Sequence, residues 1–370
     1  MMKPEVTIDG VRAHAFRIPT DAPEADGTIA WDSTTLVLVE VTGGAQTGIG
    51  YTYTAAAAVG LIEKTLGPAI DGGDVMDPQA AWLRMQRTVR NLGRQGIAAT
   101  AISAVDTALY DLKARLLGVP LFHLLGAYRD RVPIYGSGGF TSYTDQQLEE
   151  QLAGWVAKQG CAFVKMKIGS EPARDAHRVR VAKRAIGDRA RLFVDANGAY
   201  TVKQALAFAD LFTEQDVGWF EEPVSSDDLR GLGAIRARAP ATMEIAAGEY
   251  AYTLDDVRTM LQAYAVDVQQ ADVTRCGGIT AFLQIASLCE AFHIDLSGHC
   301  APALHLHVAC ASPRLRHLEW FHDHARIEAM LFDGAPIPRN GMIRPDPSRP
   351  GNGLSFKHQD AARYAVQGSA

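Results

Sequence analysis

From Arg131 onward the chain alternates short apolar runs with amphipathic stretches, and this repeat constrains the fold more than any other feature of the sequence. Eight of the runs are predicted as strands, each followed by a helix or helical turn. The predicted strands are 132–135, 162–168, 192–195, 218–220, 243–246, 266–269, 294–296 and 317–319. A repeat of this kind indicates an α/β fold, a (β/α)8 TIM barrel.

The alternative fold is an open, doubly wound sheet. Such a sheet usually carries a Gly-x-Gly-x-x-Gly turn directly after its first strand. Here the first strand is followed by Gly136-Ser137-Gly138-Gly139, which lacks that spacing. The barrel is therefore the preferred prediction.

The N-terminal part of the chain has a different order of predicted strands and helices from the barrel repeat. Strand-forming stretches at 6–18, 34–41 and 49–54 are followed by a helix at 98–117 that has one apolar stripe. We therefore predict an α+β capping domain over 1–130 and a catalytic barrel over 131–340. A segment rich in Pro, Gly and Asp, 341–370, is expected to pack back on the cap. Helices of the barrel are predicted at 145–158, 171–186, 202–213 and 279–291.

Composition excludes several classes of protein. The formal net charge is -6 and no block of Lys and Arg reaches five residues, so neither nucleic acid nor an anionic membrane is an expected partner. The sequence contains no run of about 18 apolar residues, the length needed to span a membrane. No apolar run like a signal-peptide core follows the N-terminus. The five scattered cysteines, an odd number without a C-x-x-C pair, indicate reduced thiols of a cytoplasmic protein.

Nearly every predicted barrel strand ends in an ionisable or polar residue. With one charged residue taken per strand from Lys167 to Glu319, neighbours lie 20 to 28 residues apart, close to one strand–helix unit. Taken singly, each could be a solvated charge or a turn residue. Because barrel enzymes carry their chemistry at the carboxyl ends of the strands, we expect the whole set around one rim. The set is Lys165, Lys167, Asp195, Asn197, Glu221, Glu249, Asp272, His299 and Glu319.

Three of these residues, Asp195, Glu221 and Glu249, are carboxylates on consecutive strand ends. Held close together without a cation they would repel one another. A set of oxygen ligands favours a hard divalent ion, so we predict Mg2+ here, with Mn2+ as a possible substitute.

Groups able to move protons lie on other strand ends. Strand alternation places Lys165 and Lys167 on one face of their strand. Asp272 and His299 come from neighbouring strands, and a carboxylate on one imidazole nitrogen leaves the other free to carry a proton. Glu319 could be an ion-pair partner or a buried neutral acid that donates to a developing oxyanion.

Two histidine pairs have H-x-H spacing, one at His305 and His307 and the other at His322 and His324. No cysteine or carboxylate lies at a useful offset from either pair in the sequence. A zinc site is therefore not predicted from them.

The strand-end motifs resemble those of the enolase superfamily, and two of them place the chain near the mandelate racemase group. The resemblance covers essentially the whole chain, and its motifs are specific for the group but not for a substrate. The motifs are Val164-Lys165-Met166-Lys167-Ile168-Gly169, Val194-Asp195-Ala196-Asn197-Gly198, Trp219-Phe220-Glu221-Glu222-Pro223, Ala247-Gly248-Glu249, Asp272-Val273-Thr274-Arg275-Cys276-Gly277-Gly278-Ile279 and Ser297-Gly298-His299.

The resemblance implies a cap on a modified (β/α)8 barrel, with Mg2+ bound by Asp195, Glu221 and Glu249. It also implies that Lys167 is a general base on one face of the substrate and that His299, held by Asp272, is the acid or base on the other. Further implied roles are contact of Lys165 with the substrate carboxylate, a hydrogen bond from Asn197 to substrate and stabilisation of the intermediate by Glu319. Members of the family are often oligomers, so a homo-oligomer is expected.

The implied chemistry is removal of the proton next to the carboxylate of a small-molecule substrate. Loss of the beta hydroxyl would then make the enzyme an acid sugar dehydratase; return of a proton on the other face would make it a racemase or epimerase, and cycloisomerisation is a further alternative. The motifs serve all of these reactions. A first cap loop predicted at 19–33 carries Asp21, Glu24, Asp26 and Asp32, and Tyr51-Thr52-Tyr53-Thr54 follows the next strands, whereas Trp31 would suit an aryl substrate. These polar groups favour a polyhydroxy acid, and hence the dehydratase.

Overall fold

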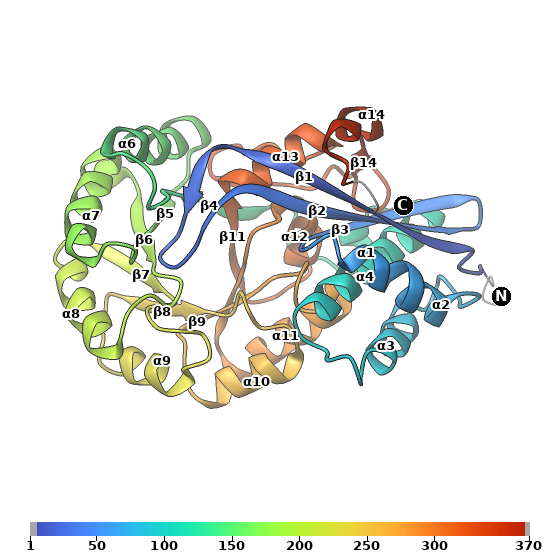
Figure 1. Ribbon diagram of the computed structural model, residues 1–370, viewed down its shortest axis with the longest axis horizontal. Helices are drawn as coiled ribbons and strands as arrows, with labels where there is room; N and C mark the ends of the chain where they lie inside the picture. The colour runs from blue at the N-terminus through green and yellow to red at the C-terminus, as the bar shows by residue number, and fades with distance from the viewer. Residues whose placement is uncertain (1–5, 367–370) are drawn as a thin grey trace.

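The computed structural model describes residues 6–366, and within them eight parallel strands close into a barrel (Figure 1). Each strand pairs with its sequence neighbour, and β11 pairs with β4 to close the ring. The strands are β4 (Val132–Gly138), β5 (Phe163–Lys167), β6 (Arg191–Asp195), β7 (Val217–Glu221), β8 (Glu244–Ala247), β9 (Val268–Ala271), β10 (Asp295–Gly298) and β11 (Leu315–Phe321). The predicted TIM barrel is confirmed.

Helices connect these strands and cover the outside of the barrel (Figure 1). Three of them begin at capping boxes, in which Thr144, Thr201 or Thr253 accepts from the backbone of the third helical residue. The helix predicted over 145–158 ends as a π-helical turn, η2 (Trp155–Gln159). The helices are α6 (Asp145–Gly154), α7 (Pro172–Ile186), α8 (Val202–Thr213), α9 (Leu229–Arg236), α10 (Leu254–Gln262), α11 (Gly278–Phe292), α12 (Pro302–Cys310) and α13 (His322–Leu331).

One barrel strand lies two residues later than predicted, because β9 runs over Val268–Ala271 rather than 266–269. The polar pair Gln269 and Gln270 suggested the end of the strand. Both side chains are in fact fully buried, and the Gln269 amide donates to the carbonyl of Gln270 at 2.9 Å. A buried glutamine with a backbone acceptor is compatible with a central strand, which polarity alone could not indicate.

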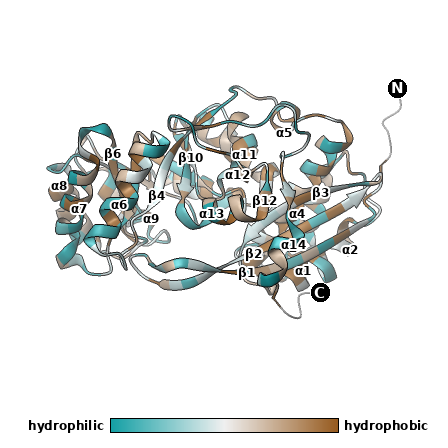
Figure 2. Ribbon diagram, turned by 90° about the horizontal axis from the view of Figure 1, so that it is seen from above, coloured by the Kyte–Doolittle hydropathy of each residue, from teal (hydrophilic) through white to brown (hydrophobic). Residues whose placement is uncertain are grey.

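The N-terminal part forms an antiparallel sheet of β1 (Gly10–Ala25), β2 (Ala30–Gly43) and β3 (Gln46–Tyr53) with helices on one face, as predicted. The helix α4 (Ile97–Leu116) packs on β2 and β3 and is buried on nearly all sides. This cap lies beside the barrel, and its long β1–β2 hairpin reaches across the barrel (Figure 2). The remaining cap helices are α1 (Ala58–Leu61), η1 (Ile62–Leu66), α2 (Gly67–Ile70), α3 (Pro78–Thr88) and α5 (Leu121–Leu124).

The predicted loop at 19–33 is wrong. β1 continues to Ala25 and β2 begins at Ala30, with an irregularity in the register between Pro19 and Glu24. Proline and acidic residues disfavour strands, which is why the sequence predicted a loop. Pairing of the two strands and their contacts with the barrel override that local preference.

The C-terminal segment contacts both parts of the molecule. β13 (Met342–Ile343) pairs antiparallel with β4 of the barrel. β14 (Ser355–Phe356) pairs with β12 (Phe332–Asp333), and the Phe356 ring packs against Phe16 of the cap. The segment ends in α14 (His358–Ala361) and η4 (Ala362–Tyr364). The domain boundaries near 130 and 340 stay a prediction, and residues 1–5, used in the argument against export, and 367–370 lie outside the described residues.

Within residues 6–366 no helix is long and apolar enough to cross a membrane. The five cysteines are all free and buried.

Two glycines of β3 allow the cap sheet to approach α4 closely. A Cβ atom on Gly50 would lie 2.2 Å from the Ala104 carbonyl oxygen, and one on Gly48 would lie 2.3 Å from the Ala108 carbonyl oxygen. We therefore expect Gly50→Ala to destabilise the protein by about 1–3 kcal/mol, measured as a fall in thermal midpoint by circular dichroism. The control is Gly60→Ala, because a Cβ on this helical glycine meets no atom within 4 Å and should stabilise slightly. Equal effects of the two changes would contradict this explanation.

Candidate active site

The predicted strand-end residues lie at the carboxyl ends of the barrel strands, beneath the cap hairpin. Lys167, Asp195 and Glu221 are the last residues of β5, β6 and β7, and Asp272 and His299 directly follow β9 and β10. A cavity of about 370 Å³ lies between this rim and the cap. Its walls include Asp26, Trp31, Ser33, Thr34, Thr35, Tyr53, Thr54, Lys167, Asn197, Glu249, Tyr250, Arg275, His299, Cys300, Glu319, Phe321 and His324.

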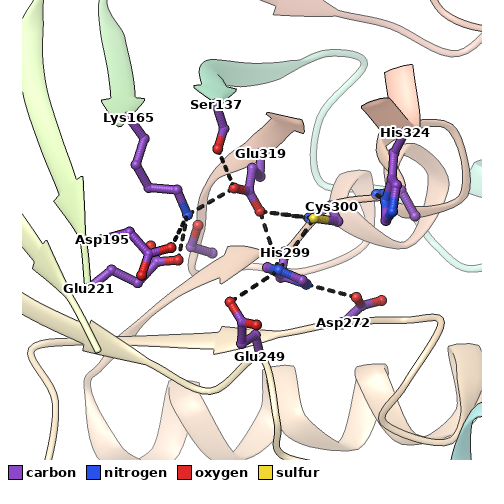
Figure 3. A network of polar contacts seen from close by, with 12 residues as sticks. Ser137, Lys165, Asp195, Glu221, Glu249, Asp272, His299, Cys300, Glu319 and His324 are labelled. Atoms are coloured by element: carbon purple, nitrogen blue, oxygen red, sulfur yellow. Dashed lines mark hydrogen bonds and ion pairs between the residues drawn. The ribbon is translucent and has the colours of Figure 1, made fainter. Parts of the chain in front are cut away.

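Asp195, Glu221 and Glu249 are brought together as expected. Each offers a carboxylate oxygen within 4.8 Å of the others, and all three residues are buried (Figure 3). The Glu249 Oε2 atom is buried without a hydrogen-bond partner in the described structure. Burial and the nearby Asp195 carboxylate raise the pKa of Glu221 to about 8, against the lowering effect of Lys165. Three converging carboxylates fit a hard divalent cation, which would relieve the repulsion between them.

Both lysines of β5 lie among these carboxylates. Lys165 is fully buried, contacts Glu221, and lies 2.8 Å from Glu319 and 3.5 Å from Asp195 (Figure 3). The Lys167 Nζ atom donates to Asp195 Oδ2 at 2.6 Å. Burial lowers the pKa of Lys167 and Lys165 adds to that effect, but the Asp195, Glu249 and Glu221 carboxylates together outweigh both and raise the pKa above its usual range. Without a cation on Asp195, Lys167 is therefore held in its charged form.

His299 is held by Asp272, as the sequence predicted. The His299 Nδ1 atom lies 2.8 Å from Asp272 Oδ2, and Asp272 is fixed in turn by the Thr274 backbone and hydroxyl at 2.7 Å each. The His299 Nε2 atom faces Glu249 Oε2 at 3.3 Å and Glu319 Oε2 at 3.6 Å. Burial lowers the pKa of His299, but the Glu249 and Glu319 carboxylates and the bond to Asp272 raise it, and the pKa lies well above its usual value.

Glu319 is an ion-pair partner in this structure. Its Oε1 atom accepts from Ser137 Oγ at 2.6 Å and lies 2.8 Å from Lys165, while Oε2 accepts from the Cys300 amide at 3.0 Å. Burial raises the pKa of Glu319, but Lys165 and His299 outweigh burial and hold it below its usual range. Of the two interpretations that the sequence left open, the geometry favours the charged carboxylate.

Several residues beside the site have left-handed backbone conformations that side chains rarely adopt. Asn197 has φ 45°, Glu222 has φ 37°, Cys300 has φ 52° and Ala301 has φ 38°. All four lie within three residues of a barrel strand end. Strained backbone of this kind persists where the surrounding structure holds it, and it is concentrated at functional sites. Asn197 lines the cavity, and its Oδ1 atom is buried without a hydrogen-bond partner among the described residues.

Sequence reasoning missed several residues that line the cavity, including His324 and Cys300. The Tyr53 and His324 rings stack with centroids 3.5 Å apart, and the Tyr53 hydroxyl has no partner among the described residues. The Cys300 Sγ atom lies 3.3 Å from His299 Nε2. Burial and Glu319 raise the pKa of Cys300, so it stays a thiol. In the sequence, only the position of Cys300 next to His299 could have indicated that it lines the cavity.

The acidic residues of the cap hairpin do not all face the cavity. Asp21 pairs with His322, Asp26 accepts from the backbone of Thr28 and Ile29, and Asp32 points outward. Glu24 is fully buried and accepts from the Trp31 ring, and burial raises its pKa to about 8. Of the four acids only Asp26 lines the cavity. The other polar residues of the lining, besides the ionisable groups of the rim, are mostly residues that carry hydroxyl groups: Ser33, Thr34, Thr35, Tyr53, Thr54 and Tyr250.

Two family models match this chain. Residues 14–126 match the mandelate racemase / muconate lactonizing enzyme N-terminal domain, and residues 147–361 match the enolase C-terminal domain-like model.

Individual proteins match along nearly the whole chain. The crystal structure of a mandelate racemase/muconate lactonizing enzyme-like protein from Rubrobacter xylanophilus is 50% identical, with a TM-score of 0.95, over 97% of this chain and 100% of that one. A 3,6-anhydro-alpha-L-galactonate cycloisomerase from Streptomyces coelicolor is 33% identical over 97% of this chain and 99% of its own. The structure of L-talarate dehydratase from Polaromonas, complexed with Mg and L-glucarate, is 30% identical, with a TM-score of 0.86, over 98% of each chain.

Proposed function

Because the chain belongs to the mandelate racemase / muconate lactonizing enzyme family of the enolase superfamily, we propose that it dehydrates an acid sugar to a 2-keto-3-deoxy acid. It is a magnesium-dependent enzyme of this superfamily, a lyase or an isomerase. One observation carries the proposal: Lys167 and the Asp272-held His299 line the same cavity as the metal-binding carboxylate Glu249. The site thus combines two proton-transfer groups with a cation site.

Asp195, Glu221 and Glu249 would hold Mg2+, with Mn2+ as a possible substitute. When bound, the ion stabilises negative charge that develops on the substrate carboxylate as the alpha proton leaves. The Lys165 ammonium group contributes to the same end. It is buried and fixed by Glu221 and Glu319, so it needs no rearrangement as charge develops.

Lys167 is the proposed base that removes the alpha proton. Its Nζ atom reaches both the cavity and Asp195. Asp195 would share its charge with a bound cation, which would weaken the ion pair that keeps Lys167 protonated. Together with the neighbouring Lys165 charge, this would lower the pKa of Lys167 toward the range of a working base.

His299 is the proposed acid that protonates the departing beta hydroxyl. Asp272 fixes the Nδ1 side of the ring, so the Nε2 side carries the proton toward the cavity. We expect a structure with substrate to place Lys167 and His299 on opposite faces of the alpha carbon, each within about 3 Å of its target or one water away. Asn197 is the proposed hydrogen-bond partner of a substrate hydroxyl, and Glu319 keeps Lys165 in place.

Cycloisomerisation is the second candidate, supported by the Streptomyces coelicolor relative that aligns along nearly the whole chain. Dehydration expels the beta oxygen as water, whereas an isomerisation that opens a ring retains that oxygen in the product. Racemisation or epimerisation would instead use His299 to return a proton to the alpha carbon. The hydroxyl-rich cavity supports a polyhydroxy acid for any of these reactions.

A screen of aldonic, aldaric and uronic acids and their anhydro forms, with Mg2+ present, tests the proposal. We expect one class to give a 2-keto acid that semicarbazide traps, with a product mass lower by one water. A keto product of unchanged mass would move the assignment to cycloisomerase. Inversion at the alpha carbon without any keto product would move it to racemase or epimerase.

The cellular setting and assembly are further expectations. We propose a cytoplasmic homo-oligomer acting on a small carboxylate, with neither nucleic acid nor membrane as partner. Light scattering of the purified chain tests the oligomeric state.

A further inference from the structure

A second group of metal-ligating side chains lies outside the proposed active site, where the cap hairpin meets the barrel. Asp21 and Glu24 come from β1, and His322 is the first residue of α13. Each of the three offers a ligand atom within 4.8 Å of the other two. The His322 Nε2 atom lies 3.0 Å from Asp21 Oδ2. The cluster therefore joins residues 301 positions apart in the sequence, Asp21 and His322.

Glu24 supplies an independent indication of a ligand. Its side chain is fully buried, and its Oε2 atom accepts from the Trp31 ring nitrogen at 2.7 Å. The Oε1 atom is also buried and has no hydrogen-bond partner among the described residues. A buried carboxylate oxygen without a partner is costly, and Glu24 also offers a carboxylate oxygen within 4.8 Å of one of Asp21. A cation bound between the two carboxylates and the imidazole would give the unpartnered Glu24 oxygen a partner.

We propose that Asp21, Glu24 and His322 form a site for a divalent transition metal ion such as Zn2+, which ties the cap hairpin to the barrel. One imidazole nitrogen and two carboxylate oxygens match the ligand types of zinc, with water in the fourth position. The imidazole makes the site softer than the oxygen-only site at Asp195, Glu221 and Glu249, so it prefers Zn2+ to Mg2+. Solvent reaches the site, because the side chains of Asp21 and His322 are 46% and 25% exposed.

The position of the cluster gives the ion a structural consequence. The hairpin tip rests on the barrel through a small apolar cluster of Phe140, Tyr143, Cys300 and Phe321, against which Ala22 and Trp31 pack. Trp31 lines the substrate cavity and is held by Glu24. An ion bound to Glu24 therefore fixes both the hairpin and one wall of the cavity.

The test measures Zn2+ bound to the intact chain by calorimetry in excess Mg2+, with Co2+ absorption as a second readout. We expect wild-type protein to bind one Zn2+ that Asp21→Asn and His322→Gln each weaken by about 100-fold or more. Asp21→Asn preserves the shape of the side chain, so loss of binding would not reflect unfolding. A thermal shift on adding Zn2+ should disappear in the same variants.

Two control variants locate the ion. The side chain of Asp32, an acid of the same hairpin, is 87% exposed. Asp32→Asn should therefore leave Zn2+ affinity unchanged. Cys300→Ser alters the other soft cluster, formed by His299, Cys300 and Glu319, and should also leave it unchanged. Zn2+ binding that is lost in Cys300→Ser but kept in Asp21→Asn and His322→Gln would overturn the proposal. So would a wild-type chain that binds no Zn2+ at millimolar concentration.

Discussion

Glu221→Gln should lower turnover by about 10³-fold or more and weaken Mg2+ binding. The substitution removes one of three converging carboxylates and also the closest partner of Lys165. Both effects act where negative charge develops on the substrate. Loss of about 4 kcal/mol of transition-state stabilisation corresponds to a factor of this size. Steady-state kinetics with titrated Mg2+, and calorimetry of Mg2+ binding, measure the two effects separately.

The matched control is Glu244→Gln. Glu244 is also a carboxylate on a barrel strand, but it begins β8 at the opposite rim and pairs with Arg316 at 2.6 Å. The Glu244→Gln protein should retain both turnover and Mg2+ affinity. Removal of metal by exhaustive chelation should abolish wild-type activity, and added Mg2+ should restore it. Full activity after chelation, or an active Glu221→Gln protein, would contradict the assignment of the metal site.

His299→Asn should abolish dehydration, with a loss of about 10²–10⁴-fold, the usual contribution of a positioned acid. It should nevertheless retain exchange of the substrate alpha proton with solvent deuterium, because Lys167 remains in the cavity. The two activities are expected to separate because Lys167 removes the alpha proton and His299 protonates the departing hydroxyl. Proton magnetic resonance of the substrate in D2O measures exchange, and semicarbazide trapping measures product.

Lys167→Met is the matched variant. It removes the proposed base while leaving the His299–Asp272 pair intact, and it should lose exchange and dehydration together. The reverse pattern, exchange lost in His299→Asn and kept in Lys167→Met, would show that His299 removes the proton. Circular dichroism of both variants checks that the loss does not come from unfolding.

Most acidic residues of the cap hairpin face away from the cavity in which a polyhydroxy substrate would bind. The sequence suggested that acids of the cap loop face the substrate, but Asp21, Glu24 and Asp32 bind His322, Trp31 and Arg17 instead. Tyr53 and Thr54, which the sequence also indicated, do line the cavity and support the same substrate class. The proposed class is unchanged, but it now rests on the hydroxyl groups and not on the acids.

The sequence by itself determined the barrel and the set of residues on its rim. Parallel strands in a barrel place all their carboxyl ends at one face, so a repeat of one ionisable residue per strand–helix unit brings Lys167, Asp195, Glu221, Asp272 and His299 together without further information. Apolar periodicity likewise predicted α8 at its observed bounds. These are consequences of local patterns and of fixed strand geometry.

Only the tertiary structure decided what depends on contacts between distant segments. The hairpin over 19–33 is extended because β1 and β2 pair with each other and rest on the barrel, which overrides the local preference of proline and acidic residues. The spacing of His322 and His324 did not predict a metal site, because the acidic residues beside His322 in the structure come from the other end of the chain. Side-chain partners at such separations are set by packing, and no local pattern encodes them.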